Sequence, residues 1–330
     1  MLVMLRVGVI GLGSMGKNHA RVCSEINNIE LVGVSDINPD TAKNIAKRVN
    51  TQAFVDYKEL ISDIDAAIIA TPTVNHFEIA NQLLDAGKHI LIEKPICESV
   101  QNAQMLVDKA ENTGLSLAVG HIEKHNPAVK FVKEALVKGE FGQLITLTTK
   151  RVSNFPGRIK DVGVILDFGV HDIDVMRLLA GEIISVYAKA GRFNPGINHE
   201  DHANIVLNFE NGICGVMEIN WLTPIKIRKL FLTCSGKFIE ADYIQQSVKI
   251  SSSTFKDINE MNLYDSSVDY NVNKVTLEKK EPLRNEIEDF INAIENHQKP
   301  LATGSDGLTT LKICQAATQS YKNGEEVKIT

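Results

Sequence analysis

The stretch Val7-Gly-Val-Ile-Gly-Leu-Gly-Ser-Met-Gly16 decides the fold of this 330-residue chain. It starts with a short apolar strand, and Gly11, Gly13 and Gly16 follow in the spacing G-x-G-x-x-G. In that pattern the first glycine permits a tight turn and the second lets the backbone approach a pyrophosphate. The third allows close packing of the next helix, whose first amides favour a bound phosphate. The stretch therefore predicts a dinucleotide-binding strand, loop and helix.

An acidic residue follows the second predicted strand, Leu31–Ser35. Asp36 stands 20 residues after Gly16, where the ribose-binding acid of a dinucleotide fold is expected. A carboxylate at this position accepts hydrogen bonds from ribose hydroxyls and repels a 2′-phosphate. The sequence therefore predicts NAD rather than NADP as cofactor, with the loop residues Ser14 and Met15 also in contact with it.

Short apolar runs alternate with helical patterns throughout the first 120 residues. The later apolar runs cover 66–70, 89–92 and 115–119, and the helical patterns cover 40–49, 75–86 and 99–112. Strands that alternate with helices of this length indicate an α/β fold with a doubly wound parallel sheet.

The pattern changes after Gly120, where period-2 segments follow one another without helices between them. This is typical of an open, mainly antiparallel sheet and indicates an α+β domain. The expected strands cover 144–151, 183–191, 202–209, 214–221, 229–234 and 238–241, and the expected helices 127–138, 164–180, 285–295 and 307–321. We predict a dinucleotide-binding domain over 1–120 and a substrate-binding and oligomerisation domain over 121–330. The polar segment 251–280 receives no assignment.

Composition limits the function classes. A net charge of −6 and an aromatic content of 6% predict no nucleic-acid partner. No apolar run reaches the roughly 18 residues that span a membrane. The cysteines are odd in number and scattered, which favours a cytoplasmic, reduced chain; they are Cys23, Cys97, Cys214, Cys234 and Cys314. Neither His121 and His125 nor His199-Glu-Asp-His202 has a convincing zinc spacing, so no metal is expected.

Two groups of residues suit the oxidation of an alcohol. Lys94, in Glu93-Lys-Pro95, ends the fourth predicted strand, where parallel strands face a ligand crevice, although a surface lysine is the alternative. Asp167 and His171 are four residues apart and share a face of a predicted helix. A packed core histidine is the alternative there. With the glycine loop present, we expect His171 as general base, Asp167 orienting it and Lys94 polarising the hydroxyl.

Together these motifs resemble the Gfo/Idh/MocA oxidoreductase superfamily over nearly the whole chain. The matching pieces are the Gly11–Gly16 loop, Asp36, Thr71-Pro72…His76, Glu93-Lys94-Pro95, Gly163…Asp167-Phe-Gly-Val-His171-Asp-Ile-Asp174, Glu286…Phe290-Ile-Asn-Ala and Asp306-Gly…Leu311. The resemblance implies a Rossmann domain, a second domain on an open antiparallel sheet, catalysis by Lys94, Asp167 and His171, and a cis Lys94–Pro95 bond. It also implies further cofactor-binding residues, namely Thr71, Pro72, His76, Glu93 and Lys94.

Two strings resemble the subgroup of that superfamily acting on nucleotide sugars, the UDP-N-acetylglucosamine 3-dehydrogenases. They are Gly120-His-Ile-Glu-Lys-His-Asn-Pro127 and Arg151-Val-Ser-Asn-Phe-Pro-Gly-Arg158. Lys124-His125 replaces the Arg-Phe usual in the subgroup, which keeps a positive charge but loses a bidentate guanidinium. The implied substrate-binding residues are Lys94, His121, Lys124, Asn126, Arg151, Arg158, Asp167 and His171. Among them, Arg151 and Arg158 are candidate ligands of a diphosphate or uronate, and ordinary strand-edge and loop charge is the alternative for both.

The implied reaction is the NAD-dependent oxidation of a sugar secondary alcohol, foremost at C3 of UDP-N-acetylglucosamine or its uronate, to the 3-keto nucleotide sugar. Two alternatives stay open. An inositol or free-sugar dehydrogenase needs no nucleotide-binding arginines, and a non-catalytic dinucleotide-binding regulator needs no base. Trp221 is expected in the sheet core or a subunit interface. An open sheet with an apolar outer face predicts a homodimer or homotetramer through the second domain.

Overall fold

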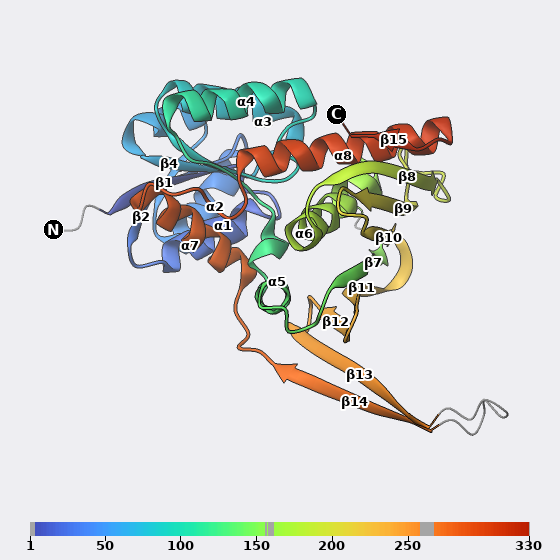
Figure 1. Cartoon of the computed structure of the whole chain (residues 1–330). Helices are drawn as coiled ribbons and strands as arrows, with labels where there is room; N and C mark the ends of the chain where they lie inside the picture. Colours follow the sequence, from blue (N-terminus) through green and yellow to red (C-terminus); the bar gives the residue numbers. More distant parts are fainter. Residues whose placement is uncertain (1–3, 156, 158–161, 258–266, 330) are drawn as a thin grey trace. The chain divides into compact units, whose positions relative to one another are not determined.

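The computed structural model describes residues 4–155, 157, 162–257 and 267–329. The chain folds into two compact units, each built on its own sheet (Figure 1). Unit 1 combines residues 1–125 with 281–312, and unit 2 combines 126–280 with 313–330. The units differ from the predicted domains, because 281–312 packs in unit 1 rather than with the second sheet.

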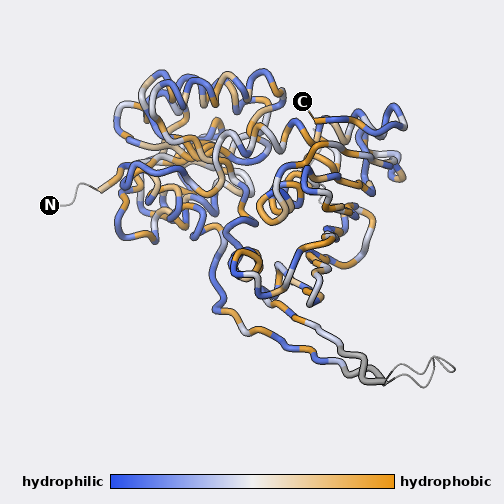
Figure 2. Tube along the Cα trace, in the orientation of Figure 1, coloured by the Kyte–Doolittle hydropathy of each residue, from blue (hydrophilic) through white to orange (hydrophobic). Residues whose placement is uncertain are grey.

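Six parallel strands form the sheet of unit 1 within the described residues, in the order β3-β2-β1-β4-β5-β6. They are β1 (Leu5–Ile10), β2 (Ile29–Ser35), β3 (Gln52–Phe54), β4 (Ala66–Ile69), β5 (His89–Ile92) and β6 (Leu117–Val119). Apolar residues concentrate along its central strands (Figure 2). This order is that of doubly wound dinucleotide folds and confirms the predicted class. Strand β3 was not predicted, because its three residues are largely exposed.

Helices cover both faces of this sheet. In unit 1, α1, α2 and α7 pack on one face and α3 and α4 on the other (Figure 1). Their bounds are α1 (Gly16–Glu25), α2 (Pro39–Val49), α3 (His76–Asp85), α4 (Val100–Thr113) and α7 (Pro282–Glu295), with short turns η1 (Tyr57–Asp63), η2 (Thr73–Asn75) and η3 (Ile122–His125). Helix α2 begins at Pro39, one residue before the predicted pattern, and Asn38 caps it by accepting the amides of Asp40 and Thr41 at 3.0 and 3.1 Å.

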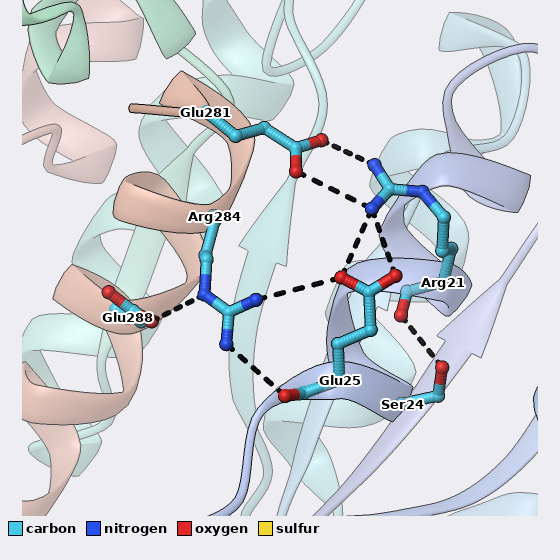
Figure 3. Close-up of polar contacts among 6 residues, drawn as sticks. All are labelled: Arg21, Ser24, Glu25, Glu281, Arg284 and Glu288. Atoms are coloured by element: carbon cyan, nitrogen blue, oxygen red, sulfur yellow. Dashed lines mark hydrogen bonds and ion pairs between the residues drawn. The ribbon is translucent and has the colours of Figure 1, made fainter. Parts of the chain in front are cut away.

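Helix α7 is distant in sequence from the rest of unit 1, yet it is held against α1. Its apolar residues join the core beneath α1. At the exposed side, Arg21 contacts both Glu25 and Glu281, while Arg284 contacts Glu25 and Glu288 (Figure 3). These side chains are each more than a third exposed. Apolar packing, rather than the ion pairs, therefore supplies most of the attachment.

The sheet of unit 2 has nine strands among the described residues, in the order β14-β13-β12-β11-β7-β10-β9-β8-β15. Only the β10–β7 pairing is parallel there, which confirms a mainly antiparallel sheet. The strands are β7 (Leu144–Asn154), β8 (Ile183–Gly191), β9 (His202–Phe209), β10 (Cys214–Asn220), β11 (Leu222–Cys234), β12 (Phe238–Asp242), β13 (Ser247–Asp257), β14 (Ser267–Thr276) and β15 (Val327–Lys328). Strands β13 and β14 pair as a long hairpin in the segment that received no assignment (Figure 1).

Helical segments pack on this sheet around one apolar core. They are α5 (Pro127–Val137), the π turn η4 (Ile165–Gly169), α6 (Val170–Ala180) and the second half of α8 (Gly304–Asn323), whose first half belongs to unit 1. Trp221 is 2% exposed in this core, with its ring centroid 5.5 Å from that of Phe155 and 6.1 Å from that of Phe168. The tryptophan is therefore a core residue, one of its two predicted places.

Candidate functional site

The glycine loop joins β1 to α1 at the carboxyl edge of the parallel sheet. Gly11 has a φ of 85°, and a Cβ there would lie 2.8 Å from the Ala70 backbone. A Cβ on Gly16 would lie 1.7 Å from the Gly11 carbonyl oxygen, whereas one on Gly13 would meet nothing within 4 Å. The turn and the helix packing thus require glycine, and the open space at Gly13 leaves room for a pyrophosphate. Met15, the N-cap of α1, places no side-chain hydrogen bond on the first amides.

Asp36 follows β2 and faces this loop. Its Oδ2 accepts the Leu12 amide at 2.8 Å, and its Oδ1 accepts the Asn38 amide at 2.9 Å. An ionised carboxylate has about four acceptor positions, so these two bonds leave capacity for ribose hydroxyls. The described residues of unit 1 therefore fit a dinucleotide at both its pyrophosphate and its ribose.

His76 joins two segments that leave the sheet at the same edge. Its buried ring places Nδ1 3.0 Å from the Pro95 carbonyl oxygen and Nε2 2.9 Å from the Thr71 carbonyl oxygen. Burial lowers the pKa of His76, although the carbonyls oppose that shift. The enclosed ring supports the connections after β4 and β5, whereas Pro72 is exposed and Thr71 partly exposed. Direct contact with a cofactor therefore suits Thr71 and Pro72 better than His76.

Glu93 fixes the beginning of the Lys94 turn. Its Oε1 lies 2.9 Å from His19 Nε2 of α1, and its Oε2 accepts the Lys94 amide at 3.3 Å. The pKa of Glu93 is lowered overall. Burial alone would raise this pKa, but the hydrogen bond and charge of His19, together with the charge of Lys94, have the larger effect. A Cβ on Gly120 would lie 3.0 Å from Glu93 Oε2, so the chain after β6 packs on the same carboxylate. The Lys94–Pro95 peptide bond is cis, as the resemblance implies.

Asp167 and His171 lie in unit 2, on the helical segment predicted over 164–180. The structure confirms its extent, but its first turn, Ile165–Gly169, is a π-helix, and α6 begins only at Val170. Such turns are rare and frequently occur at functional sites. Asp167 is 7% exposed and His171 is half-buried. Because the helical register changes between them, the i, i+4 relation of a regular α-helix does not describe this pair.

Several side chains of the predicted substrate-binding string 120–127 are buried or paired within unit 1. The Lys124 ammonium is 4% exposed and lies 3.2 Å from Asp306 Oδ2. His121 is 1% exposed. Burial, together with the charges of Lys124 and His121, lowers the pKa of His125 to about 4. These side chains are therefore paired or packed within unit 1, and the predicted contact of His121 and Lys124 with substrate stays a prediction.

Arg151 and Asn126 are engaged within unit 2. The Arg151 guanidinium is 1% exposed and donates from Nε and Nη2 to Asp172 Oδ1 at 3.1 and 2.9 Å. Asn126 caps α5 through the Ala128 amide and donates to the Tyr243 carbonyl at 3.0 Å. Both side chains thus make structural contacts within unit 2, and their predicted contact with substrate stays a prediction. Arg158 lies outside the described residues.

A pocket of about 520 Å³ lies within unit 1 at the opposite edge of the sheet. It is lined by His89 and Leu117, which begin β5 and β6, and by Gly304 at the start of α8. It is separate from the glycine loop. Among the described residues, no group of three or more His, Cys, Asp and Glu side chains is placed to hold a metal ion. Of the helices in those ranges, none is long and apolar enough to cross a membrane.

The doubly wound sheet, the glycine loop and Asp36 define a dinucleotide-binding protein. A family model for the oxidoreductase family with an NAD-binding Rossmann fold matches residues 5–121, and the GFO/IDH/MocA C-terminal domain matches residues 129–238. The chain therefore belongs to the GFO/IDH/MocA family of oxidoreductases, and unit 1 carries its NAD-binding domain.

Relatives of this chain act on different substrates. A UDP-N-acetylglucosamine 3-dehydrogenase of Acidithiobacillus ferrooxidans is 30% identical over 96% of both chains. Its solved structure matches with a TM-score of 0.85 at 28% identity, over 97% of this chain and 99% of that one. An inositol 2-dehydrogenase of Rhizobium meliloti is 28% identical over 98% of this chain and 99% of its own.

Proposed function

We propose that this chain is an NAD-dependent dehydrogenase that oxidises a secondary alcohol of a sugar to a ketone. The observation that carries the proposal is the placement of Lys94 after β5, at the sheet edge that also holds the glycine loop and Asp36. The same chain has Asp167 and His171 on one helical segment of unit 2. The dehydrogenase names of its relatives support the same reaction class.

The Gly11–Gly16 loop, Asp36 and the Thr71–Pro72 segment would hold NAD, which accepts a hydride from the carbinol carbon. His171 takes the hydroxyl proton, a contribution of about 10²–10⁴-fold to the rate. Asp167 fixes the imidazole tautomer and stabilises its protonated form. The Lys94 ammonium donates a hydrogen bond to the same oxygen as negative charge develops on it.

The foremost substrate in this proposal is UDP-N-acetylglucosamine or its uronate, oxidised at C3. Its support is the relative that matches over 96% of both chains. Arg151 and Arg158 are the candidate diphosphate ligands, and since Arg151 is paired with Asp172 within the fold, Arg158 would bind the diphosphate.

An inositol or free sugar is the second candidate. The ion pair of Arg151 with Asp172 favours it, because one of the two candidate diphosphate ligands is already paired within the fold. The inositol 2-dehydrogenase relative also covers almost the whole chain. A non-catalytic regulator is the third reading, and it predicts NAD binding without turnover.

A substrate panel separates the three. We expect NADH formation with NAD and UDP-N-acetylglucosamine or its uronate, competitive inhibition by UDP, and a KM raised roughly ten- to a hundredfold in Arg158→Ala with little change in kcat. Turnover of myo-inositol without inhibition by UDP would favour the inositol or free-sugar dehydrogenase over the nucleotide-sugar enzyme. If no member of the panel is turned over, the non-catalytic regulator is supported. His171→Asn should lose about 10²–10⁴-fold in kcat while its affinity for NAD stays unchanged. A folded His171→Asn enzyme with normal turnover would disprove the general-base role.

We also propose that a second copy of the chain covers the outer face of the unit 2 sheet. Val216, Thr148 and Phe231 lie side by side across β10, β7 and β11, and Phe231 stacks with Phe238 at 6.2 Å. Val216 and Phe238 are 37% and 43% exposed. Light scattering should show a dimer or tetramer that Phe238→Glu weakens, and a monomeric wild type would exclude it. The cytoplasmic location belongs to this proposal too, supported by five free cysteines.

A further inference from the structure

Glu200, from the string His199-Glu-Asp-His202, lies beside the helical segment that carries Asp167. Its side chain is 8% exposed and its neighbour Asp201 is fully buried. The Glu200 carbonyl oxygen accepts the Val164 amide at 3.0 Å, and Glu200 Oε1 accepts the Ile165 amide at 3.1 Å. One residue on the chain leading into β9 thus binds two consecutive amides at the beginning of the π turn.

Those amides need an acceptor from elsewhere in the chain. The first four N–H groups of a helix have no partner within the helix, and Val164, the N-cap residue, provides no side-chain hydrogen bond. A carboxylate at this end also interacts favourably with the helix dipole. Glu200 therefore takes the part of an N-cap side chain, although it is 35 residues away in sequence from Ile165.

Gly163 shows how closely this carboxylate approaches the turn. A Cβ built on Gly163 would lie 2.0 to 2.3 Å from three carboxylate atoms of Glu200. Gly163 is not among the glycines with positive φ, so its backbone conformation alone does not require glycine. The space that glycine leaves is occupied by Glu200. Because Gly163 also accepts the Asp167 amide at 3.0 Å, the carboxylate, the glycine and the Asp167 backbone form one connected set.

We propose that Glu200 is a positioning residue for Asp167 and His171, which it fixes by capping the π turn. The expected effect on turnover rests on the proposed function, because Asp167 and His171 are the proposed orienting residue and base. The expected effect on the π turn itself is independent of that function. Loss of the cap should let the first turn fray or change its register, which displaces Asp167.

The experiment compares Glu200→Ala with Glu200→Gln, whose amide oxygen can still accept the Ile165 N–H. Glu182→Ala is the matched control, because Glu182 pairs with Arg177 near the other end of the same segment and is 57% exposed. We expect kcat to fall about ten- to a hundredfold in Glu200→Ala, the range for a small misplacement of catalytic groups. The KM for NAD should stay unchanged. Glu200→Gln should recover most of the loss, and Glu182→Ala should behave as wild type.

Hydrogen–deuterium exchange of peptides covering 162–171 gives a readout that does not depend on catalysis. Exchange should become faster in Glu200→Ala and stay slow in Glu200→Gln and Glu182→Ala. If Glu200→Ala does not fold, Gly163→Ala provides a second test, because its methyl group displaces the carboxylate and should reproduce both effects. In a Glu200→Ala background that folds, Gly163→Ala should add little, since both changes remove the same contact.

Two results would overturn the inference. The first is a Glu200→Ala enzyme whose exchange rates in 162–171 and whose kcat equal those of Glu182→Ala. The second is a Glu200→Gln enzyme whose kcat is as low as that of Glu200→Ala. Failure of the proposed function looks different. In that case His171→Asn turns over normally while exchange in 162–171 still responds to Glu200→Ala.

Discussion

The pH dependence of unit 1 stability should change when His125 is replaced by phenylalanine. The His125 side chain is 8% exposed, and burial together with the charges of Lys124 and His121 lowers its pKa to about 4. Phenylalanine has a similar shape and cannot take up a proton. The backbone contact at this position, in which the His125 carbonyl accepts the Asn285 side chain at 3.0 Å, does not depend on the imidazole.

The magnitude follows from the difference between folded and unfolded pKa values. An unfolded histidine titrates near 6.5, so above that pH both states are neutral and His125 contributes nothing to the pH dependence. As the pH falls from about 6.5 to about 4, the unfolded state takes up a proton that the folded state refuses. Each pH unit then removes about 1.4 kcal/mol, or about 3 kcal/mol over the whole window. Near pH 5 the loss is about 2 kcal/mol.

Urea unfolding of both proteins near neutral pH and near pH 5 measures this difference. The transition of unit 1 can be identified by its shift on adding NAD, since a ligand stabilises the unit that binds it. Wild type should lose about 2 kcal/mol more than His125→Phe on acidification. His76 and His89, whose pKa values burial also lowers, leave a residual slope in both proteins. His297→Asn, at an exposed histidine, should keep the wild-type difference. Equal losses in wild type and His125→Phe would refute the reasoning.

Three further outcomes follow from contacts in the structure. Asp36→Ser should weaken NAD binding and improve the relative use of NADP, and a wild-type preference for NADP would contradict the role of the carboxylate. Arg151→Ala should cost about 3–5 kcal/mol of stability, because it leaves Asp172 buried without this partner. A stable Arg151→Ala enzyme with only a raised substrate KM would instead support the predicted substrate-binding role. Arg284→Ala should cost less than about 1 kcal/mol in urea unfolding, because its ion pairs with Glu25 and Glu288 are exposed, and a larger loss would show that they hold α7 on α1.

The sequence predicts those parts of the molecule whose signals are local. The glycine loop, the alternating strands and the helix over 164–180 follow from spacing and periodicity, and all three are present. The π turn within that helix has no signal in the apolar pattern, because Glu200 supports it from a distant segment. His19 was missed for a similar reason. Its partner Glu93 is 74 residues away, and only the fold brings them together.

The string 120–127 shows what the fold adds to a resemblance. The resemblance implies that Lys124 binds substrate, and the structure adds an ion pair with Asp306, in the segment that returns to unit 1 after the second sheet. The same segment accepts the Val119 amide through the Ala302 carbonyl and provides Asn285, which binds the His125 carbonyl. These contacts explain together why 281–312 leaves the predicted second domain and why Lys124 is buried. Lys124 links the string 120–127 to the 281–312 segment through one carboxylate, that of Asp306. Such an ion pair needs one positive charge and no bidentate group, so it does not require the guanidinium usual at this position.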